Sequence, residues 1–140
     1  MTPRALPLAA ALAGCIDNAP AAPPPLDRAL FAAVVQPHLA ARCASPACHG
    51  SERRRLRVYA PGLFRADATR THRDEPLTPA ELAANERSAA AFAQEAPAAA
   101  ESLLVTKPLN RVNHLGGRVF DETDEAHAAL VEWLQSGGLP

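Results

Sequence analysis

The chain has 140 residues, the length of one domain. Its formal net charge of −1 argues against nucleic acid as a partner, and no run of about 20 apolar residues is present that would predict a membrane-spanning helix. Alanine supplies 32 of its apolar residues and only six residues are aromatic. We therefore expect a thin core unless a large apolar group is added to it, because stabilisation by burial scales with apolar area.

The first 14 residues are typical of an export signal, with Arg4 ahead of a short apolar run over 5–13. The sequence Leu-Ala-Gly-Cys at 12–15 resembles the lipobox of bacterial lipoproteins. This resemblance implies a lipoprotein signal peptide over 1–14 and acylation of Cys15. A free cysteine in an alanine-rich leader is the alternative. Residues 15–25 are rich in Pro and Ala and predict an extended tether. We expect an exported bacterial lipoprotein whose acyl chains hold it at a membrane surface, on the periplasmic face of the inner or outer membrane or at the cell surface.

The folded body is expected to span 26–140 and to be mainly helical. Asp27 is a good N-cap for a first helix, and Leu26 can pack on Phe31 in a hydrophobic staple. Apolar spacing gives this helix one buried face, and Pro37 should kink or end it. The residues on that face are Phe31, Val34, Val35, His38 and Leu39.

Three further elements follow in chain order. Leu56 and Val58 could form a very short strand. Thr78 to Glu81 form a capping box with Pro79 at the first helical position, opening an alanine-rich helix that Pro97 should stop. Four acidic residues at 121–125 precede a last helix, which the glycines at 137–138 end. Its apolar face is Ala126, Leu130, Trp133 and Leu134.

The chemistry-bearing motif is Cys43, then Cys48 four residues later, with His49 directly after it. Covalent haem attachment uses Cys-x-x-Cys-His, in which two thiols meet the two vinyl groups and the next imidazole reaches the iron. Here the spacer is four residues instead of two. Both sulfurs can still reach one porphyrin edge if Ser45-Pro46 bulges outward as a turn.

Several segments together resemble a class I cytochrome c domain, particularly the planctomycete-type subgroup of bacterial lipoprotein cytochromes. They are 35–39 with 48–50, Ser-Leu-Leu-Val-Thr-Lys-Pro-Leu at 102–109, His-Leu-Gly-Gly at 114–117, and the Trp133 helix ending in two glycines. The resemblance implies a small cytochrome c-like fold around one haem c, with Cys43 and Cys48 in thioether bonds and His49 as the proximal iron ligand. Residues 65–100 match nothing in that family and are interpreted as an insertion.

The second axial ligand cannot be methionine if the leader is removed, because Met1 is the only methionine. His114 is the first candidate, since it lies in a loop before the last helix, where class I cytochromes bring in this ligand, and Gly116-Gly117 would let the backbone approach the porphyrin. The other candidates are His38, His72 and His127, or no protein ligand. Ligation by two imidazoles predicts a low or intermediate reduction potential relative to a His/Met cytochrome.

Arginine is concentrated around the motif, with eight arginines and two acids over 42–73, including Arg53-Arg54-Arg55. This segment either forms a rim that pairs with haem propionates or steers an acidic redox partner, or is an ordinary solvated surface. Trp133 is expected near the haem or against the first helix.

The sequence thus predicts a membrane-tethered monohaem cytochrome that is not an enzyme and passes single electrons between redox partner proteins. Two alternatives stay open. One is an open-site haem protein that binds a gas or peroxide. The other is a cofactor-free lipoprotein with a Cys43–Cys48 disulfide. A zinc site fits less well, because a fourth ligand at suitable spacing is missing.

Overall fold

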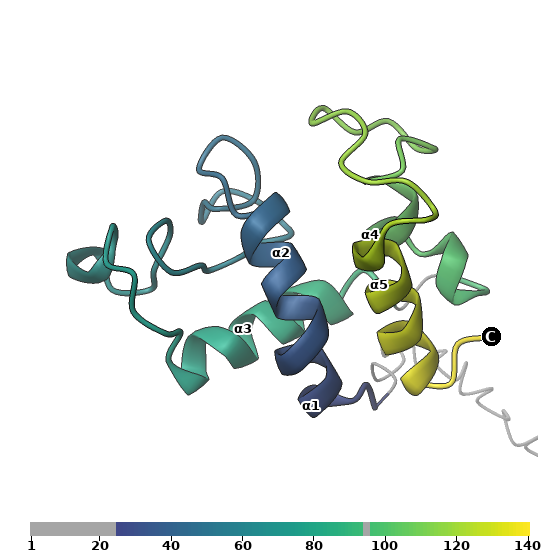
Figure 1. Ribbon diagram of the computed structural model, residues 1–140, viewed down its shortest axis with the longest axis horizontal. Coiled ribbons are helices and arrows are strands. Elements are labelled where there is room, and N and C mark those ends of the chain that lie inside the picture. Colours follow the sequence, from purple (N-terminus) through teal and green to yellow (C-terminus); the bar gives the residue numbers. More distant parts are fainter. Residues whose placement is uncertain (1–24, 94–95) are drawn as a thin grey trace, which may run out of the picture.

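The computed structural model describes residues 25–93 and 96–140, and within these ranges the chain is mainly α-helical with no β-strand (Figure 1). The expected signal peptide, Cys15 and all but the last residue of the expected tether lie outside the described residues. No helix in the described part of the chain is long and apolar enough to cross a bilayer.

The first helix runs without interruption through α1 (Arg28–Leu30), one turn of π-helix (Phe31–Val35) and α2 (Gln36–Arg42). Asp27 caps it as predicted, with its carboxylate accepting from the amides of Ala29 and Leu30. Pro37 does not end the helix: the wider π turn directly before it changes the hydrogen-bond register, and Gln36 N–H bonds back to the Phe31 carbonyl. The helix therefore continues to the cysteine motif.

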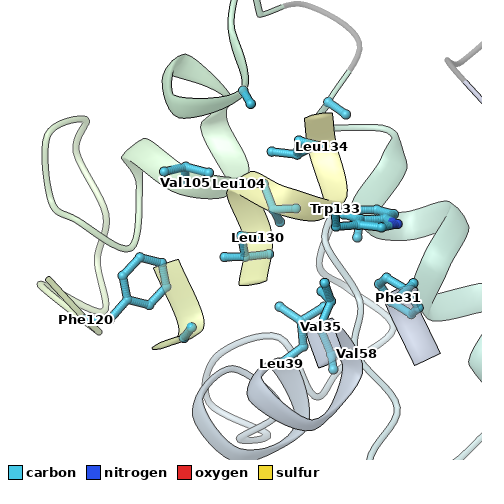
Figure 2. Packing of buried hydrophobic residues seen from close by; sticks show 14 of the residues in the cluster. Phe31, Val35, Leu39, Val58, Leu104, Val105, Phe120, Leu130, Trp133 and Leu134 are labelled. Atoms are coloured by element: carbon cyan, nitrogen blue, oxygen red, sulfur yellow. The ribbon is translucent and has the colours of Figure 1, made fainter. Parts of the chain in front are cut away.

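The core lies between the first helix and α5 (Glu125–Ser136), as Figure 2 shows. Trp133 is fully buried, with its ring 5.0 Å from that of Phe31, and its indole N–H donates to the Asp27 carbonyl. Of the two places predicted for Trp133, the structure selects the first helix. All four residues of the predicted α5 face are buried, and Asp124 caps this helix. These contacts fix α5 alongside the first helix.

A long-range polar network joins α3 (Pro79–Ala90) to this core, and it replaces the strand predicted at 56–58. The Tyr59 N–H donates to Asn85 and the Arg57 N–H to Ser88, so side chains of α3 satisfy this extended segment where a partner strand would otherwise be needed. Asn85 also donates to Gln36 on α2. Residues 65–100, interpreted from the sequence as an insertion, thus contribute to the domain's interior.

The capping box at Thr78 and Glu81 is present as predicted, but α3 ends at Ala90 rather than near Pro97. Tight turns follow, in which Phe92 N–H bonds to the Ala89 carbonyl and Ala93 N–H to that of Ala90. They turn Ala93 into the core, so burial stops the helix before proline can.

Two short helical segments follow, a 3-10 turn (Ala99–Glu101) and α4 (Leu103–Thr106), and both contact α5. A long loop over 107–124 then leads into α5. Figure 1 shows that this loop and the loop after α2 emerge at the same end of the helices. That end carries the predicted site.

Candidate functional site

The segment from Cys43 to Gly50 is a closed loop at the C-terminal end of α2. Cys43 caps the helix, His49 N–H donates to the Cys43 carbonyl at 3.0 Å, and Cys48 N–H donates to the Ser45 carbonyl at 2.8 Å. Pro46 therefore occupies the second position of a turn that begins at Ser45, as predicted. The turn absorbs the longer spacer and keeps both cysteines on one pocket.

Gly50 is required to close this loop, because a Cβ at this position would lie 2.0 Å from the Ala44 carbonyl oxygen. We expect Gly50→Ala to break the hydrogen bonds of Gly50 and His49 across the loop, at a cost of about 2 kcal/mol in free energy of unfolding. Urea denaturation measures this cost. Gly62→Ala is the control, since Gly62 has positive φ but open space around it, and it should cost about 1 kcal/mol from backbone strain alone. Equal losses in both variants would contradict the steric role of Gly50.

Cys43 and Cys48 are free thiols, half-buried and not joined by a disulfide. Burial raises the pKa of Cys43 to about 11, the neighbouring Cys48 adds to this effect, and Arg42 opposes it. The Cys43 thiol is therefore protonated at neutral pH.

His49 is held in one tautomer by the chain. Its Nδ1 lies 2.9 Å from the Leu56 carbonyl oxygen, which can only accept, so Nδ1 carries the proton. Burial lowers the pKa of His49, and the hydrogen bond to Leu56 acts in the opposite direction. The neutral ring presents the lone pair of Nε2, the form in which imidazole binds metals.

His114 is held in the same way on the opposite loop. Its Nδ1 lies 2.9 Å from the Gly117 carbonyl oxygen, which leaves Nε2 as the acceptor nitrogen of the neutral ring. Gly116 and Gly117 were predicted to let the backbone approach a porphyrin, whereas in the structure they shape the turn around His114. Gly117 supplies the positive φ of the turn, and a Cβ on Gly116 would lie 3.0 Å from Cε1 of His114, so the glycine makes room for the imidazole.

The two imidazoles, 65 positions apart in the sequence, lie close together and both line the pocket. Their ring centroids are 6.1 Å apart and their planes are within 10° of parallel. A metal ion bound by one nitrogen of each ring would place the centroids about 6 Å apart, since a metal–nitrogen bond is about 2 Å and each nitrogen lies about 1 Å from its ring centre. The spacing therefore fits two axial ligands on one ion.

The pocket beside these residues has a volume of about 660 Å³, within the range of roughly 300–1,000 Å³ found for cofactor sites. Both cysteines, both histidines and mostly apolar side chains line it. The apolar wall includes Leu39, Leu56, Phe92, Leu104, Phe120 and Leu130. These residues could hold a large flat apolar group with a metal at its centre, attached through the two thiols.

The other histidines proposed from the sequence do not reach the pocket. His127 packs edge-on against Phe120 with ring centroids 6.3 Å apart, and His72 lies in a turn with a φ of 72°. His38 is half-buried on the first helix. Of the four candidates, only His114 lines the pocket with His49.

The arginine-rich segment contributes to the pocket in part. Arg54 and Arg55 line it together with Lys107, whereas Arg53 does not. Arg54 also donates to the Ala47 carbonyl, which ties it to the cysteine loop. These cations would face any carboxylates at this edge of a bound group.

Sequence reasoning missed the groups that orient the site. The carbonyls of Leu56 and Gly117 fix the two imidazoles, and Phe92, from the segment interpreted as an insertion, forms part of the wall. Every residue has a backbone carbonyl, so the sequence does not show which carbonyls bond the two imidazoles. Besides the turn residues Ser45 and Pro46, Gly50 after the Cys-His pair is a sequence sign of this tight loop.

The described residues contain no cluster of three or more His, Cys, Asp or Glu side chains placed to hold a metal ion. A closed zinc site needs four protein ligands, whereas two imidazoles suffice as axial ligands when a porphyrin supplies the remaining four. The two imidazoles and two thiols on this pocket are the residues that could hold a haem iron and its porphyrin. Comparisons with protein-family models, with curated proteins and with solved structures find no match to this chain.

Proposed function

We propose that this protein is a membrane-tethered monohaem c-type cytochrome that transfers single electrons between redox partner proteins. Cys43 and Cys48 hold the haem by thioether bonds, and His49 and His114 are its axial ligands. The observation that carries the proposal is the imidazole pair, with near-parallel rings 6.1 Å apart whose Nδ1 atoms are both bound to carbonyls. Together with two free thiols on the same pocket, this donor set fits covalent haem.

The haem supplies a one-electron iron couple when it is bound. The chain's own residues determine how that couple behaves. The Leu56 and Gly117 carbonyls hold both rings in one tautomer and orientation, which limits rearrangement at the iron between its two oxidation states. Leucine and phenylalanine side chains make most of the pocket wall apolar, which lowers the polarity around a bound group.

The composition of the core also supports the proposal. Seven of the 19 buried apolar residues are alanines, which pack closely but bury little area each. A bound porphyrin would extend the apolar contact made by Leu39, Phe120 and Leu130, which already link the pocket to the core. The protein would therefore gain stability from its cofactor.

The test is the mass of the protein expressed with haem-attachment machinery and exported. We expect the intact mass to include one haem that survives denaturation, and to lose it in the Cys43→Ser/Cys48→Ser double variant. Cys15→Ser is the matched control: it removes the expected lipid but should keep the haem, so the protein leaves the membrane fraction and stays coloured. A haem-free chain two hydrogens lighter than the reduced mass would overturn the proposal in favour of the disulfide.

A further inference from the structure

A second cavity, of about 320 Å³, lies beside the cysteine–histidine pocket and is lined mainly by arginine. Arg54, Arg55 and Arg57 approach it from the segment after the motif, and Arg87 approaches it from α3 together with Ser88. Because one wall comes from a loop and the other from a helix, the fold gathers these guanidinium groups from residues 30 or more positions apart.

Fixed contacts hold the two walls together. The Arg57 N–H donates to the Ser88 hydroxyl oxygen at 2.8 Å, and that hydroxyl donates to the Arg55 carbonyl at 3.4 Å. The Arg57 guanidinium lies over the Tyr59 ring, 5.3 Å from its centroid. The backbone of the loop is therefore fixed against α3, and the Arg57 guanidinium is placed by its contact with Tyr59.

None of these four arginines forms an ion pair within the described residues, although six others do. Glu86, the acid next to Arg87 in the chain, pairs instead with Arg28 at 2.7 Å. Like charges gathered without counter-charges repel one another, and an anion in the cavity would remove that cost. Arginine binds carboxylate and phosphate oxygens through two parallel N–H bonds, which a cavity with several guanidinium groups can repeat.

We propose that this arginine cavity is a binding site for a phosphate-type oxyanion, carried either by a free anion or by a phospholipid headgroup. Arg57 and Arg87 line only this cavity, whereas Arg54 and Arg55 also line the cysteine–histidine pocket. The site is thus separate from the proposed haem site although it shares a wall with it. The inference does not depend on electron transfer, because oxyanion binding needs no redox centre.

The test measures binding to the full protein as purified, by calorimetric titration with inorganic phosphate and by co-sedimentation with phosphatidylglycerol vesicles. We expect saturable binding that weakens with added salt, and roughly tenfold or greater weakening in Arg87→Gln, which removes a charge-assisted bond. Arg53→Gln is the matched control, since Arg53 belongs to the same triplet but does not line the cavity. Phosphate binding identifies a free anion as ligand, and binding to vesicles alone identifies the headgroup. No saturable binding of either probe, or equal weakening in both variants, would overturn the proposal.

Discussion

Replacing His114 with alanine is expected to convert a six-coordinate, low-spin haem into a five-coordinate or water-ligated one that binds carbon monoxide. The reason is geometric, because His114 is the one other imidazole that lines the pocket, with its ring 6.1 Å from that of His49. Carbon monoxide binds ferrous iron that has an open position, so the variant should show a shifted Soret band under the gas and the parent protein should not. Optical spectra of the dithionite-reduced proteins measure this difference.

His127→Ala is the matched control for this substitution. His127 is also half-buried and lies beside Phe120, which borders the pocket, but its ring does not line the pocket. The control should keep the low-spin spectrum. If His114→Ala instead leaves the spectrum of the parent unchanged, the iron is not bound by His114, and an open-site haem protein that binds a gas or peroxide becomes the better account.

Replacing Glu81 with glutamine should destabilise the protein by about 3–5 kcal/mol, the cost of removing one partner from a buried ion pair. The Arg65 and Glu81 side chains are 0% and 2% exposed, and two guanidinium nitrogens of Arg65 bond the carboxylate at 2.8 and 3.0 Å. The same carboxylate accepts from the amides of Ala66 and Thr78. Glutamine would leave a buried cation uncompensated and turn an NH₂ group toward these donors. Urea denaturation at pH 7 measures the loss.

Glu122→Gln is the control, because Glu122 pairs with Arg111 at the surface, where both side chains are at least half exposed. Exposed pairs contribute roughly 0–1 kcal/mol, so this variant should stay close to the parent. Similar losses in Glu81→Gln and Glu122→Gln would show that burial of the first pair has no energetic consequence.

The same ion pair predicts an acid-sensitive step in stability. The hydrogen bonds from Arg65 hold the pKa of Glu81 at about 2, below its ordinary value of 4.5. A folded-state pKa lower than the unfolded one stabilises the protein above pH 4.5, and this stabilisation, about 3 kcal/mol, is lost as the pH falls from about 5 to 2. In Glu81→Gln the free energy of unfolding should change less over that range.

Local signals in the sequence predict most of the helices. Asp27, the box at Thr78 and Glu81, and Asp124 each cap a helix through their own neighbours, so short windows contain the information needed. Pro37, predicted to kink or end the first helix, does not end it, because the π turn directly before it shifts the hydrogen-bond register. The local sequence therefore predicts where helices begin, but it does not predict the π turn or how far each helix continues.

The polar interior could not be predicted. Glu81 was recognised as a capping residue, but its pairing with Arg65 depends on a loop 16 positions away folding onto the start of α3. The extended segment around Val58 was read as a strand because its side chains suit one, whereas Asn85 and Ser88 take the backbone bonds that a second strand would supply. Hydrogen bonds between side chains and a distant backbone segment produce no periodic pattern in the sequence, so they could not be predicted from it.

The cysteines and histidines of the candidate site could be predicted from the sequence, but the groups that orient them could not. The residue types and spacing of the Cys-x4-Cys-His motif indicate a ligand role. The position of His114 before the last helix indicated which histidine would lie near His49. The carbonyls that orient the rings, and the arginine cavity formed with Arg87, depend on long-range folding.

The central claim is that His49 and His114 bind one haem iron held by Cys43 and Cys48. The most direct test is the optical spectrum, oxidised and then reduced with dithionite, of the exported protein expressed with haem-attachment machinery. The account predicts a Soret band and, on reduction, sharp α and β bands of low-spin iron that carbon monoxide does not change. Well-expressed, exported protein with no Soret band would contradict it.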